Sequence, residues 1–200
     1  MEIINYPQRS IEWYERRLGS IGGSSIASVC SKGQGKMRKN LMYRLAGEIL
    51  SGQSYDGYKN YHMDRGIEEE ADAINTYIAV TGNEIESVGL VKESKHKHCS
   101  PDGWINPNGI LEVKCVIPSV HCEIIYQNEI PSEYRKQCQW GLFICQCDYV
   151  DFVSYSPFVL EKPIWIIRRG RDEELIKEMD EEADKFISEL DDLIKRIKEA

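Results

Sequence analysis

Ser100-Pro101-Asp102-Gly103-Trp104-Ile105, followed after a polar turn by Ile110-Leu111-Glu112-Val113-Lys114-Cys115, is the stretch that decides the fold of this chain. Both halves are short and apolar enough to form strands. Side chains alternate along a strand, so the second half is predicted to bury Leu111, Val113 and Cys115. Glu112 and Lys114 then share the opposite face.

The acids and the lysine of this stretch suit metal-dependent cleavage of phosphodiester bonds. Carboxylate oxygens are the ligands that Mg²⁺ prefers, and a bound cation helps to activate water and to stabilise developing charge. Asp102 and Glu112 are the candidate ligands, and Lys114 is the neighbouring cation. The pattern is short, so an ordinary hairpin with its polar residues facing water stays open as the alternative.

The register of the hairpin decides whether the two acids meet. If residues 106–109 form a four-residue loop, Ile105 pairs with Ile110 and Asp102 falls opposite Val113, on the other face from Glu112. An active site therefore requires a loop with an odd number of residues, or a bulge that shifts the register. Gly103 and Gly109 are compatible with a bulge.

Length and composition indicate one globular domain. The chain has 200 residues, of which 42% are hydrophobic, which is enough for one good core. No apolar run approaches the ~18 residues of a membrane span, and the N-terminus has no signal-sequence pattern. We expect a soluble cytoplasmic protein of a bacterial or phage-infected cell. The seven cysteines lie mostly in apolar stretches and are expected to be reduced.

Charge is distributed unevenly along the chain. The net charge is −8, yet residues 16–47 contain seven basic residues and no acid, whereas residues 172–200 contain twelve acids and five bases. Local potential steers a ligand more than net charge does, so the basic segment favours phosphate binding over a merely solvated surface. Arg17 stands just before a loop of small residues, 19–25, whose backbone N–H groups can approach an anion. The alternative for that loop is a glycine linker.

The hydrophobic pattern predicts helices and strands in an order typical of a mixed sheet flanked by helices. Helices are expected at 10–18, 39–50, 66–80, 131–146 and 172–200, and strands at 84–92, 100–105, 110–115, 148–155 and 163–168. Residues 31–40 and 51–63 are expected to be loops, the first lying along DNA and the second carrying Tyr55, Tyr58 and Tyr61. His96 and His98 are expected at a solvated strand edge, since their spacing is a poor match to zinc ligands.

Four blocks resemble the lambda exonuclease family, also called the YqaJ-type viral recombinases, within the PD-(D/E)xK nuclease superfamily. They are Glu12-Trp13-Tyr14-x-x-Arg17-Leu18-Gly19 with Ser24, then Gly66-x-x-x-Glu70, then the central hairpin, then Gln137-x-Gln139-Trp140. The resemblance implies an α/β fold with a restriction-endonuclease-like core. It also implies a single nuclease domain over 1–200, with an N-terminal DNA-end-binding part at about 1–65 and a packing helix at about 172–199.

The same resemblance implies a role for each matching residue of the active site. Asp102 and Glu112 resemble the family's metal ligands, with the Val113 carbonyl able to assist. Lys114 resembles the residue that positions or activates water, and Glu70 resembles a helical acid near the metals. Two Mg²⁺ ions are implied for each site, with Mn²⁺ as a substitute.

Two further features follow from the resemblance. Gln139 resembles the family's motif glutamine that lines the site, and Arg17 and Ser24 resemble a pocket for the terminal 5′-phosphate. The implied activity is 5′-to-3′ degradation of one strand of linear double-stranded DNA. The product would be a 3′ overhang for a single-strand annealing partner, and the enzyme would form a homo-oligomer, a ring trimer in characterised members.

Three other functions stay open on the sequence. The same core occurs in sequence-specific or structure-specific endonucleases, although the Arg17 block argues against that class. A superfamily nuclease with an iron–sulfur cluster would use Cys30 with Cys138, Cys145 and Cys147, at a late spacing that fits poorly. A non-catalytic scaffold that binds DNA ends is disfavoured by the intact Asp102, Glu112 and Lys114.

Overall fold

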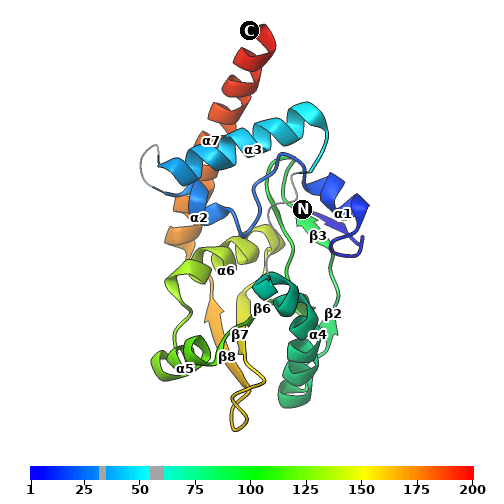
Figure 1. Ribbon diagram of the computed structural model, residues 1–200, viewed down its shortest axis with the longest axis vertical. Coiled ribbons are helices and arrows are strands. Elements are labelled where there is room, and N and C mark those ends of the chain that lie inside the picture. The colour runs from blue at the N-terminus through cyan, green and yellow to red at the C-terminus, as the bar shows by residue number, and fades with distance from the viewer. Residues whose placement is uncertain (32–34, 55–60) are drawn as a thin grey trace.

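A mixed sheet forms the centre of the protein. The computed structural model describes residues 1–31, 35–54 and 61–200, and in the last range it describes side chains from Glu69 onward. Within these residues the main sheet has the strand order β2-β5-β6-β7-β8 (Figure 1). The strands are β2 (Ile85–Glu86), β5 (Gly103–Ile105), β6 (Gly109–Cys115), β7 (Tyr149–Tyr155) and β8 (Ile164–Gly170). β6 and β7 are parallel and the other neighbours are antiparallel, so the predicted fold class is confirmed.

A smaller antiparallel sheet and seven helices in the described residues complete the fold. The small sheet is β1 (Glu2–Ile4), β3 (Leu90–Lys92) and β4 (His98–Cys99), in the order β1-β3-β4. The helices are α1 (Ile11–Arg17), α2 (Ile26–Val29), α3 (Lys36–Ser51), α4 (Tyr61–Thr81), α5 (Pro118–Gln127), α6 (Ser132–Cys145) and α7 (Glu173–Glu199). Among the described helices, none is long and apolar enough to cross a membrane.

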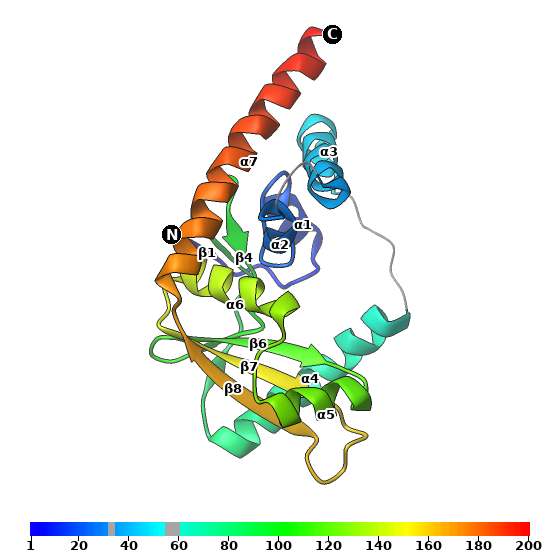
Figure 2. The same cartoon turned by 90° about the vertical axis from the view of Figure 1, so that its left-hand side faces the viewer.

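Two hydrophobic clusters cover the two faces of the main sheet. Leu111 and Val113 of β6 pack with Ala73 and Tyr77 of α4 on one face. Ile110 packs on the other face with α6 and the helices beyond it. Figure 2 shows α6 and α4 on opposite sides of the strands. The alternation predicted for 110–115 is therefore confirmed, and it leaves Glu112 and Lys114 on the α6 side.

The hairpin between β5 and β6 has the register that an active site requires. Ile105 pairs with Gly109 and Gly103 pairs with Leu111, so the loop consists of the three residues 106–108. The ladder ends at Gly103, and just beyond it the Asp102 N–H donates to the Leu111 carbonyl at 3.0 Å, one residue out of that register. The Asp102 side chain then reaches β6, where its Oδ2 accepts from the Val113 N–H at 2.7 Å, and its carboxylate lies close enough to Glu112 to interact with it electrostatically.

Three predicted elements differ from the structure. Residues 84–92 form two strands in different sheets, separated by residues 87–89, and a Cβ at Gly89 would lie 1.9 Å from the Tyr6 carbonyl oxygen. Helix α3 begins at Lys36, so much of the predicted basic loop at 31–40 is helical. Helix α4 begins at Tyr61 rather than Gly66. Residues 32–34 of the basic loop, together with Tyr55 and Tyr58, lie outside the described residues.

The C-terminal helix α7 packs along one side of α2, α3 and α6. Its Asp172 N-cap accepts a hydrogen bond from the Leu175 N–H. Of the apolar residues that recur every three or four positions along α7, Met179, Ala183, Phe186 and Leu190 are buried, whereas Ile197 is 46% exposed. Ile176 and Ile194 are buried instead at the two ends, because the 3.6-residue period drifts around the axis over so long a helix.

Candidate active site

The two acids of the central hairpin lie together, with Glu112 buried and Asp102 half-buried. The carboxylate of Glu112 belongs to a residue that is 5% exposed, and Asp102 Oδ2 accepts a hydrogen bond from the Val113 N–H at 2.7 Å. Burial raises the pKa of Asp102 well above its usual value, and the nearby Glu112 carboxylate raises it further. A pair of acids of this kind is unfavourable unless positive charge lies beside it.

Lys114 and Gln137 both contact Glu112. The Lys114 ammonium lies 2.5 Å from Glu112 Oε1, and Gln137 of α6 donates to the same oxygen at 2.6 Å. Burial acts to lower the pKa of Lys114, but Glu112 and Asp102 outweigh it and the pKa is raised. Lys114 is therefore a cation in this arrangement, with its ammonium 5.3 Å from the centre of the Tyr134 ring.

The structure brings Gln137, and not Gln139, to the carboxylates. Gln139 is buried, with its amide nitrogen donating to the Gly170 carbonyl and its oxygen accepting from the Asp172 N–H. These contacts hold the junction between β8 and α7. Residues two apart on a helix point to different sides, so only one glutamine of the Gln-x-Gln motif can face β6.

Glu70 lies near the acids from the opposite side of the sheet. Its carboxylate is bound by Arg9 at 2.7 Å, and its charge adds a smaller contribution to the raised pKa of Asp102, after burial and Glu112. Of the predicted catalytic residues, the structure thus gathers Asp102, Glu112, Lys114 and Glu70.

The donor set at this place suits a divalent cation. The carboxylates of Asp102 and Glu112 and the Val113 carbonyl are hard oxygen ligands, and Mg²⁺ takes one or two carboxylates with waters completing its shell. In the described part of the chain, no group of three or more His, Cys, Asp or Glu side chains is already arranged to hold a metal. The reason is visible in the contacts, since Glu112 is engaged by Lys114 and Gln137, and Glu70 by Arg9.

A small basic pocket contains both residues of the predicted phosphate site. Its volume is about 130 Å³, and Arg17, Ser24 and Arg44 are among the residues that line it. A cavity needs roughly 10–15 Å³ of such volume to hold one water, so this pocket has room for a phosphate group. Arg44 was not predicted, because its position on α3 gives no sign in sequence that it faces Arg17.

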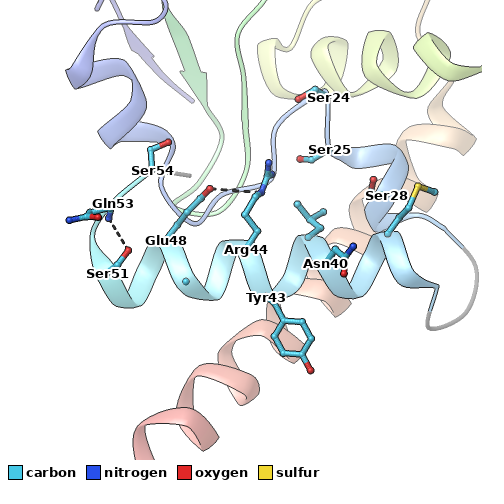
Figure 3. Close-up of a pocket in the computed structure, with 13 residues that line it drawn as sticks. Ser24, Ser25, Ser28, Asn40, Tyr43, Arg44, Glu48, Ser51, Gln53 and Ser54 are labelled. Atoms are coloured by element: carbon cyan, nitrogen blue, oxygen red, sulfur yellow. Dashed lines mark hydrogen bonds and ion pairs between the residues drawn. The ribbon is translucent and has the colours of Figure 1, made fainter. Parts of the chain in front are cut away.

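A larger groove of about 990 Å³ opens next to this pocket, between α2 and α3. Figure 3 shows Arg44 reaching from α3 toward the loop that carries Ser24 and Ser25. Glu48 of α3 lines this groove and accepts a hydrogen bond from the Gly19 N–H at 3.1 Å, which links α3 to the loop of residues 19–25. The Ser25 hydroxyl bonds to Gly22 and not to the following helix.

Gln137 connects the acids with this pocket. Its amide touches Glu112, and its Cγ lies 3.3 Å from where a Cβ of Gly23 would be. Gly23 directly precedes Ser24. Gln137 thus lies between Glu112 and the loop that carries Ser24.

Acids of the same chain neutralise part of the basic N-terminal segment. Arg38 is bound by Glu189 of α7 through two hydrogen bonds, at 2.5 and 3.1 Å, and Arg16 is bound by Glu2 at 2.7 Å. Within the described residues Arg17 forms no ion pair, and its guanidinium carbon instead lies 3.7 Å from the centre of the Trp13 ring. The basic segment is therefore not a uniform DNA-binding surface.

His98 is buried, contrary to the solvated strand edge predicted for it. It is 2% exposed and contacts Arg17 and Ser20. The alternation of lysine and histidine wrongly indicated an exposed strand edge. β4 is only two residues long, and the chain at Lys97 and His98 pairs with Ile21. The seven cysteines, which all lie in the described ranges, form no disulfide.

Comparison with known families agrees with this geometry. A family model for the YqaJ-like viral recombinase domain matches residues 12–148. The chain belongs to this family. No curated protein matches the chain.

Solved structures of similar chains support the same family. An alkaline exonuclease (LHK-Exo) from Laribacter hongkongensis is 32% identical, with a TM-score of 0.88, over 95% of this chain and 97% of that one. The same enzyme in complex with dAMP gives a TM-score of 0.89 at the same identity and coverage. A phage-related exonuclease from Haemophilus somnus 129PT, 19% identical over 89% of this chain and 96% of that one, has a TM-score of 0.71 and shares the fold. The predicted class of enzyme, an exonuclease, is confirmed at the level of the family.

Proposed function

We propose that this YqaJ-like domain is a divalent-metal-dependent exonuclease that degrades one strand of linear double-stranded DNA from its 5′ end. The products are mononucleotides and a 3′ single-stranded overhang, which a single-strand annealing partner would use in recombination. The proposal treats residues 1–200 as one nuclease domain, in which residues up to about 65 engage the DNA end. It includes a homo-oligomer, with a ring trimer as the expected form.

The position of Gln137, between Glu112 and the loop that carries Ser24, is the observation that carries the proposal. An exonuclease must cut at a fixed distance from a chain end, so the group that recognises the end and the group that cuts must be neighbours. Here one side chain spans from Glu112 to the loop of Ser24. The complex of the Laribacter enzyme with dAMP, a mononucleotide, adds support for a mononucleotide product.

Asp102, Glu112 and the Val113 carbonyl would hold the metal, with two Mg²⁺ ions for each site as the expected number. The metal would supply a Lewis acid for the phosphate oxygens and a nucleophilic water at neutral pH. The chain itself orients the donors: the Val113 N–H fixes Asp102, and Gln137 fixes Glu112. The Lys114 ammonium stabilises negative charge that develops beside Glu112.

The basic pocket would set the polarity of digestion. Arg17 and Arg44 both line it together with the hydroxyl of Ser24, and two guanidinium groups bind a phosphate in preferred bidentate geometry. Contacts to phosphate carry no sequence information, so we expect little sequence preference.

Linear duplex DNA labelled on one strand, with a 5′-phosphate or a 5′-hydroxyl end, tests the proposal in Mg²⁺ and in EDTA. We expect progressive release of mononucleotides from 5′-phosphorylated ends, and only with Mg²⁺. Discrete internal fragments, or cutting of closed circles, would identify an endonuclease instead. Binding of ends without cleavage at any metal concentration would identify a non-catalytic scaffold.

The variant Arg17→Ala tests the phosphate pocket separately. We expect it to slow digestion of 5′-phosphorylated ends by roughly tenfold or more, because a hydrogen bond to a charged group contributes about 1.5–3 kcal/mol. The rate advantage of phosphorylated over hydroxyl ends should narrow accordingly. An unchanged ratio would count against the pocket.

A further inference from the structure

His98 lies at the back of the basic pocket, on a rigid piece of backbone. Its N–H donates to the Ile21 carbonyl at 3.0 Å, and its own carbonyl accepts from the Trp140 indole at 2.9 Å. The ring is almost completely buried. A side chain held in this way has little freedom, and any group that bonds to it is held as well.

The hydrogen bonds around the ring fix which nitrogen carries the proton. The Ser20 hydroxyl donates to the Arg17 carbonyl at 2.7 Å, which uses its one proton. His98 Nδ1, 2.7 Å from the same hydroxyl oxygen, must therefore donate to it. His98 Nε2 is then the unprotonated nitrogen, and it accepts from Arg17 Nε at 3.0 Å.

We propose that His98 is the positioning residue for Arg17, and that it turns the guanidinium so that its two terminal nitrogens face the phosphate pocket. This inference rests on the proposed function of that pocket. The bond from Nε uses the inner edge of the guanidinium, and the Trp13 ring covers one of its faces at 3.7 Å. The remaining N–H groups on the terminal nitrogens are left for a ligand, already oriented before it arrives.

The electrostatics agree with this arrangement. Burial lowers the pKa of His98 well below its usual value, and Arg17 lowers it further, so the ring stays neutral and can accept. Burial also lowers the pKa of Arg17, to about 10, which leaves the guanidinium charged at neutral pH. A half-buried cation next to a neutral acceptor gains from an anionic ligand.

Gly22 makes the position of the ring tighter still. A Cβ at Gly22 would lie 2.6 Å from His98 Nε2 and 2.9 Å from Cε1. The ring thus occupies the space against the loop of residues 22–25, and it cannot move aside without breaking its bonds to Ser20 and Arg17.

Two conservative variants separate positioning from simple packing. His98→Gln can present an oxygen near the place of Nε2 and keep the bond to Arg17. His98→Asn is shorter, so it reaches only the place of Nδ1 and keeps the link to Ser20. Both are neutral, polar and smaller than histidine, which makes them a matched pair.

The measurement is kcat/KM on duplexes with 5′-phosphate and 5′-hydroxyl ends, for the full chain with Mg²⁺. We expect His98→Asn to reduce the ratio of kcat/KM for 5′-phosphate ends to kcat/KM for 5′-hydroxyl ends by about tenfold, because one hydrogen bond to a charged group is lost. His98→Gln should keep this ratio within about twofold of the wild-type value. An unchanged ratio in His98→Asn would overturn the inference. So would an equal loss on both ends in both variants, since that is what a purely structural role predicts.

Nitrogen-15 NMR of the histidine rings provides a second readout that needs no activity. We expect the Nδ1–H form of His98 in the wild-type protein, and an Nε2–H form would overturn the inference. The two proposals also fail differently. If the wild-type enzyme does not distinguish the two ends, the phosphate pocket itself is wrong, whereas discrimination that survives in His98→Asn removes only the role of His98.

Discussion

Lys114 is the residue whose removal best separates cleavage from binding. Its ammonium contacts Glu112, while Asp102 is held independently by the Val113 N–H. We expect Lys114→Ala to reduce cleavage by about 10³-fold, the upper range for loss of one group that stabilises transition-state charge. Binding of DNA ends should persist, because both acids remain. Mononucleotide release and fluorescence anisotropy measure the two properties, with the exposed Lys185→Ala as control, and full activity in Lys114→Ala would remove the proposed site.

The two glutamines of α6 form a natural pair of variants. Gln137 touches Glu112, and Gln139 bonds to Gly170 and Asp172. We expect Gln137→Ala to lower kcat by roughly 10²-fold with little change in stability. Gln139→Ala should instead destabilise the protein by about 1–3 kcal/mol, because it leaves backbone groups without their partners. Thermal unfolding together with single-turnover kinetics distinguishes them, and a reversed result would restore Gln139 as the site glutamine.

The sequence located the acids and the lysine more securely than their neighbours, for a physical reason. Strand alternation alone assigns Glu112 and Lys114 to one face. For a motif on a helix, the sequence does not show which residue faces the site, because that depends on how the helix is rotated about its axis. Gln139 was therefore predicted where the structure places Gln137. His98 and Arg44 depend on contacts between distant segments, which a single sequence does not reveal.

At the level of elements, the hairpin was predicted to bring its two acids together only with a loop of an odd number of residues or with a bulge. The structure has a loop of three residues. The loop of three residues was one of two ways to bring Asp102 and Glu112 together. The break in the strand at 84–92 was not visible, because both halves are apolar and the close approach of the Tyr6 carbonyl to Gly89 is a tertiary contact. Long periodic helices such as α7 were recovered, since packing of an apolar stripe dominates their stability.

Helix α4 is fastened to the sheet by a buried acid. Asp151 of β7 is bound by the facing Arg168 of β8 through two hydrogen bonds at 2.7 Å, and by the hydroxyl of Tyr77 from α4. We expect Arg168→Ala to lower the free energy of unfolding by roughly 2 kcal/mol, because a buried carboxylate then loses its counter-charge. The expected loss of stability is no larger than this because the Arg168 side chain is 55% exposed, so water screens part of its charge.

Urea unfolding measures this effect. The control is Arg169→Ala, since the hydrogen bonds of Arg169 go to backbone oxygens of Arg168 and Asn128. Its change should stay within about 0.5 kcal/mol, as for other surface substitutions. Equal effects of the two variants would show that the Asp151 carboxylate does not depend on Arg168.

Across the whole molecule, the acidic C-terminal helix divides the basic residues into two groups. Arg38 is committed to Glu189, and Lys97 is bound by Asp180 and Asp184 at 2.5 and 2.6 Å. Arg17 and Arg44 line the pocket instead, and the acid near Arg44 is Glu48 of its own helix, at 3.8 Å, rather than an acid of α7. A net charge of −8 is thus compatible with DNA-end binding, because the acids of α7 lie against one basic group and leave the other to the pocket.

This division predicts how binding depends on salt. Each phosphate neutralised by a cation contributes about 0.9 to the slope of log K against log salt concentration. We expect Arg17→Gln to reduce the magnitude of that slope by about one for 5′-phosphorylated duplex in Ca²⁺, which restrains cleavage. Arg38→Gln, from the same acid-free segment, should leave the slope unchanged because its charge is already paired with Glu189. A similar loss in both variants would mean that DNA displaces the acids of α7, and the basic segment would then act as one continuous surface.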